Sequence, residues 1–242
     1  MIEILLKQNG ILIPEKEGYF SAFDAELNLF SLQMPNGRLR YFPGFLTPYE
    51  ADKLLRFFME KHSSYCDDVV GGSHSADRSD WKNIPWRQDF IKMFGKMVLQ
   101  PRLTSWFADE GKGYRYSGLD MIQNAWNSEL LELKSNLEKA AQTPFNSVLM
   151  NAYRDGRDHM GWHADDELEL GLNPVIASVN FGASRRFLMR RNENQEEKVE
   201  ILLQHGSLLL MEGEMQHYWK HAIPKQLKVG QLRVNLTFRN II

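Results

Sequence analysis

Residues 232–239, with the sequence LRVNLTFR, alternate apolar and polar side chains without a break. Successive side chains of a β-strand point to opposite faces of its sheet, so this pattern predicts one strand with two different faces. Four polar side chains share one of them: Arg233, Asn235, Thr237 and Arg239. Such a face is often solvated while the apolar face covers the core, and that alternative stays open from this segment alone.

Six similar apolar runs precede this one, separated by turn residues. They are Val148–Tyr153, Val175–Phe181, Arg186–Met189, Val199–Leu203, Ser207–Met211 and Tyr218–Ile223. Short strands at this spacing are typical of a β-sandwich or jelly roll. The sequence therefore predicts a double-stranded β-helix (jelly-roll) core over residues 145–242.

Helical patterns occur only upstream of this core. Thr47 and Glu50 form a capping-box pattern with Pro48 at the first helical position, and apolar residues then recur at helical spacing over about 48–61. A second helix is predicted from about Asn127 to Gln142. We therefore expect an α+β fold in one structural unit, with residues 1–89 as an N-terminal extension packed on the core, because no Pro-rich or Ser-rich linker separates the parts.

Composition excludes several classes of protein. The 242 residues are 43% hydrophobic and 25% charged, which excludes disordered and coiled-coil chains. The formal net charge is −2, so any nucleic acid must be held locally rather than by a bulk positive field. A single cysteine, Cys66, permits no intramolecular disulfide, and any metal must use His and carboxylate ligands. We expect no targeting segment, no membrane association and a cytoplasmic location.

The densest polar segment, residues 151–167, directly follows an apolar strand. In extended backbone, His163 and Asp165 project to the same side. A second histidine would complete the two-His, one-carboxylate set of non-haem Fe(II) oxygenases. His205, His217 and His221 are the candidates for the second histidine, and His221 is favoured because it ends an apolar strand just before a turn. A zinc-protease reading of His159 and His163 requires a helix, which Gly156 and Gly161 disfavour.

Residues 215–242 contain five Lys or Arg and no acid. The arginines of the last strand therefore lack local partners, and their planar guanidinium groups suit carboxylate recognition. This pattern favours a dicarboxylate cosubstrate.

Four motifs in order resemble the AlkB branch of Fe(II)/2-oxoglutarate dioxygenases. They are Asn151-x-Tyr153, His163-x-Asp165-Asp166-Glu167, His221 and Arg233-x-Asn235-Leu-Thr-Phe-Arg239. The resemblance implies that His163, Asp165 and His221 hold iron. It also implies that Arg233 and Tyr153 lie near the distal carboxylate of 2-oxoglutarate and Asn151 and Arg239 near its other end, with Asn235 and Thr237 on the same face.

A further match lies upstream, in Phe94-Gly95-Lys96, in Pro101-Arg102 and in Tyr114-Arg-Tyr116-Ser117-Gly118. It resembles the nucleotide-recognition region of the AlkB homologue that acts on duplex DNA, and implies a nucleotide-recognition lid and supporting helix over 90–144. Phe94 would fill the space of a flipped base. Lys96, Arg102 and Arg115 would contact phosphates, and Tyr114, Tyr116 and Trp106 would line the base pocket, although alternate aromatics are more often core residues.

Two further features carry less specific predictions. Asp166 resembles the family acid that contacts the damaged base, and is alternatively a solvated acid. The segment Arg185-Arg-Phe-Leu-Met-Arg-Arg191 holds four arginines and no acid, so it is a candidate phosphate contact or a solvated strand edge.

The resemblance implies oxidative dealkylation of nucleobases. 2-Oxoglutarate and O₂ would give succinate and CO₂, the N-methyl group of 1-methyladenine or 3-methylcytosine would be hydroxylated, and formaldehyde would leave. The expected partners are alkylated DNA, single-stranded or duplex, and secondly RNA, with the protein acting as a monomer. Two rival interpretations are the same chemistry on a protein or small molecule, and a nucleic-acid-binding module without turnover.

Overall fold

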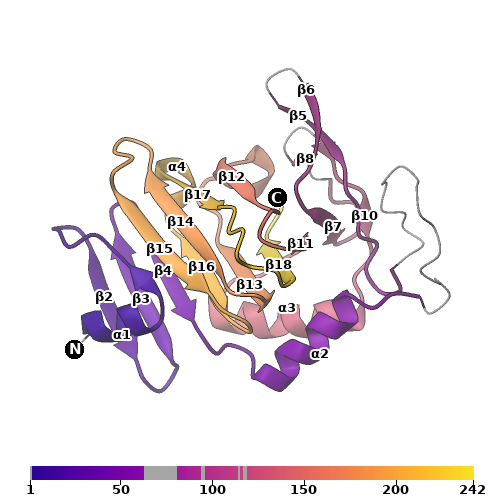
Figure 1. Ribbon diagram of the computed structural model, residues 1–242. Coiled ribbons are helices and arrows are strands. Elements are labelled where there is room, and N and C mark those ends of the chain that lie inside the picture. Colours follow the sequence, from indigo (N-terminus) through magenta and orange to yellow (C-terminus); the bar gives the residue numbers. More distant parts are fainter. Residues whose placement is uncertain (1, 63–80, 94–95, 114, 117–118) are drawn as a thin grey trace.

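The computed structural model describes residues 2–62, 81–93, 96–113, 115–116 and 119–242. Two large sheets pack face to face and helices cover the outer face of one of them (Figure 1). This arrangement confirms the predicted α+β class and is consistent with a jelly-roll core. Cys66 lies outside the described residues.

The minor sheet has five antiparallel strands. Their spatial order is β1 (Ile11–Leu12), β15 (Lys198–Leu203), β14 (Arg185–Arg191), β17 (Trp219–Ile223) and β12 (Met160–His163). β12 is therefore an edge strand.

The major sheet has nine strands. Their order is β10 (Gln123–Asn124), β7 (Leu103–Ala108), β11 (Ser147–Tyr153), β18 (Arg233–Arg239), β13 (Ile176–Gly182), β16 (Leu208–Glu212), β4 (Gly37–Phe42), β3 (Leu29–Met34) and β2 (Phe20–Asp24). Two small two-stranded sheets pair β5 (Phe90–Met93) with β6 (Lys96–Leu99) and β8 (Arg115–Tyr116) with β9 (Leu119–Asp120). The β5–β6 hairpin projects from the body of the molecule (Figure 1).

Both predicted helices form where the capping signals place them. α2 (Pro48–Phe58) begins with the capping box of Thr47 and Glu50, and ends a few residues earlier than predicted. α3 (Ser128–Ala141) is capped by Asn127 and ends at Gln142, which has a left-handed φ of 57°. The shorter helices are α1 (Ile2–Gln8), α4 (Met215–Tyr218) and the 3₁₀ turn η2 (Leu168–Leu170).

Two apolar layers stabilise this arrangement. One lies between the sheets and includes Leu149, Met189 and Ile201. The other lies between the major sheet and helices α2 and α3, and includes Phe58, Leu137 and Phe238. Burial of apolar surface drives this packing. A polar side chain on the inner face of the major sheet would be costly to bury within the apolar layer between the sheets, so polar groups are expected there only around a pocket.

Strand β18 has no solvated face. All seven of its residues are buried, with Val234, Leu236 and Phe238 in the helix-side layer. The polar residues Arg233, Asn235, Thr237 and Arg239 instead point between the sheets and line an internal pocket. The alternative of a solvated strand face is therefore wrong, because the minor sheet covers that side.

The N-terminal residues contribute more than a packed extension. Strands β2, β3 and β4 extend the major sheet, and β4 pairs with β16. The turn of the β3–β4 hairpin is Pro35-Asn36, between the paired residues Met34 and Gly37, and proline followed by asparagine is a local turn signal. Asn36 has a φ of 60°, which asparagine tolerates better than most residues.

Candidate metal centre and cosubstrate pocket

The two histidines of the predicted triad are fixed by strand pairing. His163 ends β12 and lies directly opposite His221 of β17 in the antiparallel register. Their ring centroids are 4.2 Å apart. Because both strands belong to one hydrogen-bonded sheet, the spacing between the two rings is set by backbone geometry.

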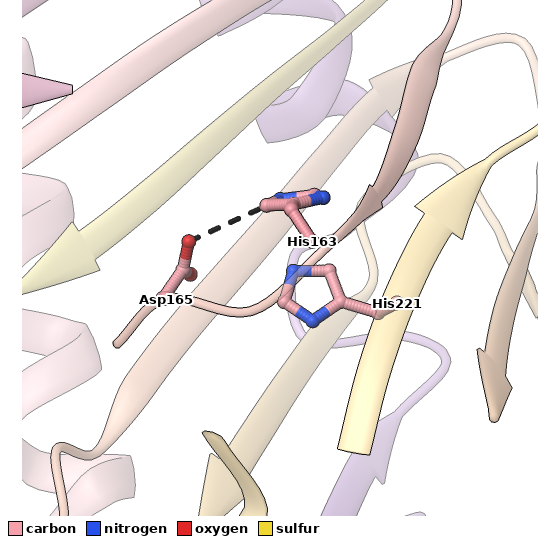
Figure 2. A group of neighbouring side chains, drawn as sticks. All are labelled: His163, Asp165 and His221. Atoms are coloured by element: carbon pink, nitrogen blue, oxygen red, sulfur yellow. Dashed lines mark ion pairs between the residues drawn. The ribbon is translucent and has the colours of Figure 1, made fainter. Parts of the chain in front are cut away.

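Asp165 comes from an irregular segment two residues beyond β12 and points toward both histidines (Figure 2). Its Oδ1 is 4.0 Å from Nε2 of His163. One ligand atom from each of the three residues lies within 4.8 Å of the others. The predicted choice of His221 is thus supported over the two other candidates. His205 accepts a hydrogen bond from the backbone N–H of Gly182 and contacts Asp52, whereas His217 lies on α4.

The protonation states of the triad suit metal binding. Nδ1 of His163 is 2.9 Å from the carbonyl oxygen of Gly161, and a carbonyl can only accept, so Nδ1 carries the proton and Nε2 is left as the ligand atom. Burial lowers the pKa of His163, and burial together with the neighbouring His163 lowers the pKa of His221 to about 3. Both imidazoles are therefore neutral near pH 7.

Asp165 is fully buried yet ionised. Burial alone would raise its pKa, but Arg239 and the two histidines outweigh it and lower the pKa to about 2. Nη2 of Arg239 lies 2.9 Å from Oδ1, while Oδ2 has no hydrogen-bond partner among the residues that the structure describes. A buried carboxylate with an unsatisfied oxygen beside two neutral imidazoles fits Fe(II), which takes this ligand set and leaves coordination positions for other ligands.

A pocket extends from the triad between the sheets. Its lining combines the triad with residues of β11 and β18, namely Leu149, Asn151, Tyr153, Arg233, Asn235, Thr237 and Arg239, and with Ser178 of β13. All six residues predicted from the resemblance to contact 2-oxoglutarate thus line this pocket. Strand pairing of β11 with β18 places Asn151 opposite Asn235 and Tyr153 opposite Arg233.

Arg233 is the group in this pocket that most clearly requires an anion. It is 1% exposed, and burial lowers its pKa to about 10, so it remains charged near neutral pH. Nη2 donates to Oδ1 of Asn180 at 2.6 Å, whereas Nε and Nη1 have no hydrogen-bond partner within the described part of the chain. A carboxylate in the pocket would accept a hydrogen bond from one of these unpaired N–H groups and compensate the buried charge.

Two arginines flank the ring of Tyr153. The guanidinium carbon of Arg233 is 4.9 Å and that of Arg185 is 5.7 Å from the ring centre. Arg185 is completely buried, and donates to the carbonyl oxygens of Asp158 and Pro224 at 2.9 and 2.7 Å. It therefore joins two turns beneath the pocket and supports Tyr153, a role that its place in an arginine cluster did not suggest.

The other three arginines of the 185–191 segment do not form one phosphate-binding patch. Arg186 pairs with Glu200, and Arg191 pairs with Glu193 and Glu197, because β14 lies beside acid-containing segments. Arg190 stacks on Trp162 at 4.3 Å and donates to Gln195. Of the four arginines, only Arg190 is partly exposed and has no carboxylate partner among the residues that the structure describes. It is therefore the one candidate phosphate contact that this segment retains.

The predicted substrate residues are placed unevenly. Lys96 and Asp166 are exposed, and Tyr116 lies in β8. Arg102 is 3% exposed, and its Nε donates to Oδ1 of Asn151 at 2.7 Å, which links it to the cosubstrate pocket rather than to solvent. Trp106 is buried opposite Leu149. Phe94, Gly95, Tyr114 and Ser117 lie outside the described residues.

Comparison with known proteins identifies the family of this chain. The model of the 2OG-Fe(II) oxygenase superfamily matches residues 38–239, most of the chain. The chain belongs to the 2OG-Fe(II) oxygenase superfamily. Fe(II) and 2-oxoglutarate are accordingly the metal and cosubstrate of the pocket, with His163, Asp165 and His221 as the facial triad.

Individual relatives place this oxygenase in the AlkB branch. It is 43% identical over 178 residues to mouse alpha-ketoglutarate-dependent dioxygenase alkB homolog 3, covering 67% of this chain and 62% of that protein. The human alkB homolog 3 is 38% identical over 213 residues, covering 84% and 66%. The bovine DNA oxidative demethylase ALKBH2 is 40% identical over 159 residues, covering 63% and 57%. The chain therefore spans about three fifths to two thirds of the length of the alkB homolog 3 relatives.

These relatives support the predicted AlkB resemblance, but the similarity to alkB homolog 3 is slightly ahead of that to ALKBH2. Sequence identity therefore does not favour the narrower expectation that this chain is most similar to the AlkB homologue that acts on duplex DNA. The solved structure of OsALKBH1 matches with a TM-score of 0.51 over 86% of this chain and 99% of that chain, at 14% identity, which supports the fold alone. Within the described residues, no helix is long and apolar enough to cross a membrane.

Proposed function

We propose that this chain is an Fe(II)- and 2-oxoglutarate-dependent dioxygenase that removes alkyl groups from nucleobases, with 1-methyladenine and 3-methylcytosine as substrates in DNA and secondly in RNA. The observation that carries the proposal is that the triad and the unpaired Nε and Nη1 groups of the buried Arg233 lie in one internal pocket. The nucleobase substrate is supported by relatives of 35–40% identity that are named DNA oxidative demethylase.

The chain's own residues supply orientation and charge. Arg233 would bind the distal carboxylate of 2-oxoglutarate through one of its unpaired N–H groups, with Tyr153 holding the guanidinium plane. Iron, when bound, supplies activation of O₂ and oxidation of the substrate's methyl carbon. Holding cosubstrate, metal and substrate in fixed positions lowers the entropic part of the barrier.

The surface beside the triad offers a place for the nucleic acid strand. Trp162 immediately precedes His163, Arg190 stacks on it, and Lys220 lies opposite Arg190 in the pairing of β14 with β17. Trp162 is partly exposed, and cationic side chains next to an accessible aromatic ring are typical of contacts to a nucleic acid strand. The region over 90–144, with the β5–β6 hairpin, exposed Lys96 and the supporting helix α3, would serve for nucleotide recognition. Phe94 would fill the space left by the flipped base, and Tyr114 and Tyr116 would line the base pocket.

The proposal is tested by mass spectrometry of short oligonucleotides that each carry one 1-methyladenine or 3-methylcytosine, single-stranded and duplex in parallel. After incubation with protein, Fe(II), 2-oxoglutarate and O₂, we expect loss of one methyl group together with formation of succinate. His163→Ala should abolish both products while still binding the oligonucleotide.

Two outcomes would contradict the proposal in different ways. Succinate formation without demethylation of any oligonucleotide would retain the oxygenase and favour a protein or small-molecule substrate. Absence of succinate with every substrate would contradict the oxygenase itself.

A further inference from the structure

The backbone at Asp165 is held by a contact that the triad does not explain. His163 and His221 are fixed by the β12–β17 ladder, but Asp165 lies beyond the end of β12 in a segment without strand pairing. Its carboxylate is oriented by Arg239. Its backbone N–H donates to Oε1 of Gln216 at 2.9 Å, a bond between two buried residues that are 51 positions apart.

Gln216 is well placed to couple two of the ligands. It lies in α4, the single turn that leads directly into β17, and His221 follows it by five residues. One side chain thus connects the irregular segment that carries Asp165 to the start of the strand that carries His221. A shift of either segment would change the distance between the two ligand atoms.

The orientation of the Gln216 amide follows from its neighbours. A backbone N–H can only donate, so the amide oxygen must face Asp165. Nε2 then points to the sulfur of Met211 at 3.9 Å, and Met211 lines the cosubstrate pocket. Because Gln216 is 3% exposed, solvent cannot replace this oxygen if it is removed, and the N–H of Asp165 would be left unsatisfied.

We propose that Gln216 is a positioning residue of the metal centre, which sets metal affinity by fixing the backbone at Asp165 through an uncharged amide oxygen. The inference rests on the metal site of the proposed function and is independent of the nucleobase substrate. Outer partners of metal ligands typically change metal affinity by about 10–100-fold when they are removed, and we expect a loss in that range here.

The test is calorimetric titration of the metal-free protein with Co(II), with the visible absorption spectrum of the Co(II) complex as a second readout. Gln216→Met keeps the length of the side chain and removes the oxygen, so it should raise the Kd by about 10-fold or more and change the Co(II) spectrum. Gln216→Glu keeps an oxygen acceptor at the same reach and should remain within about threefold of the unmodified protein.

Asn146→Leu is the matched control. The side-chain amide of Asn146 also forms hydrogen bonds with backbone, donating to the carbonyl oxygen of Ile241 and accepting from its N–H. Asn146 is not among the residues that line the pocket. It should lower the unfolding temperature without changing the Kd or the spectrum. Thermal unfolding of every variant shows whether it is folded.

The outcomes separate this inference from the proposed function. Unchanged Co(II) binding by Gln216→Met, an equal loss in Asn146→Leu, or a loss in Gln216→Glu as large as that in Gln216→Met would each overturn the role of Gln216. If the unmodified protein binds no Co(II), the metal site of the proposed function fails instead. Absence of demethylase activity with normal Co(II) binding contradicts the substrate and leaves the role of Gln216 standing.

Discussion

Arg239 and Asp165 form a buried ion pair that joins strand β18 to the segment beyond β12, with Nη2 of Arg239 2.9 Å from Oδ1 of Asp165. The two side chains are 5% and 1% exposed. The same arginine is predicted to contact 2-oxoglutarate. One residue thus links the metal ligand to the cosubstrate pocket.

Removing this arginine should make metal binding sensitive to pH. In the unmodified protein the pKa of Asp165 is about 2, so the carboxylate stays ionised throughout the neutral range and metal affinity should not depend on its titration there. In Arg239→Met, burial would raise that pKa, and protons would compete with the metal as the pH falls. We expect an affinity loss of about 10-fold or more at pH 6 that is smaller at pH 8, measured by Co(II) titration. A pH-independent loss would contradict this role of Arg239.

Arg233 should control affinity for 2-oxoglutarate rather than for the metal. Hydrogen bonds to a charged group contribute about 1.5–3 kcal/mol, so Arg233→Met should raise the KM for 2-oxoglutarate by at least about tenfold. Succinate formation at varied 2-oxoglutarate measures this effect, and Co(II) titration is the control and should be unchanged. An unaltered KM would show that the distal carboxylate binds elsewhere.

The ion pairs of Glu212 should stabilise the fold at pH values above the pKa of the Glu212 carboxyl group. Glu212 contacts Arg40 at 2.8 Å and Arg38 at 2.9 Å, and although burial opposes the effect, these arginines lower its pKa. A lowered pKa means that the contribution is fully present above the unfolded-state value and is lost as the pH falls through the folded-state value. Glu212→Gln should cost about 1–3 kcal/mol in the free energy of unfolding at pH 7.

Urea unfolding at several pH values measures this cost, which should shrink toward acid pH. Glu200→Gln is the control, because Glu200 pairs with the exposed Arg186 and should cost less than about 1 kcal/mol. A cost for Glu212→Gln that does not change with pH would argue against the ion pairs as its source.

Arg190 should contribute to nucleic acid binding through charge. Arg190→Ala should reduce the slope of log affinity against log salt concentration by about one, with a similar effect on different oligonucleotide sequences. Arg186→Ala is the matched variant on the same strand, where Glu200 already neutralises the guanidinium, and should leave the slope unchanged. Fluorescence anisotropy with a labelled oligonucleotide at several salt concentrations measures both, and equal slopes for the two variants would exclude a specific contact by Arg190.

The sequence by itself determined the elements whose signals are local. The capping box at Thr47 located the start of α2, strict alternation located β18, and the His163-x-Asp165 spacing with the ordered motifs indicated the metal ligands and the cosubstrate residues. The predictions of the helix start, the strand and the His163–Asp165 pair are confirmed, because caps, alternation and short spacings act over a few residues. The contacts to 2-oxoglutarate stay a prediction that rests on the resemblance.

Only the tertiary structure decided which face of β18 was internal and what supports the site. The minor sheet, remote in sequence, converts a polar strand face into a pocket lining. Arg185 lost its place as a phosphate candidate because it is buried against carbonyl oxygens, and Gln216 gained a role through a hydrogen bond across 51 residues. Contacts of this kind depend on the packing of distant segments, and burial, rather than residue type, decides whether a polar group binds solvent, backbone or a ligand.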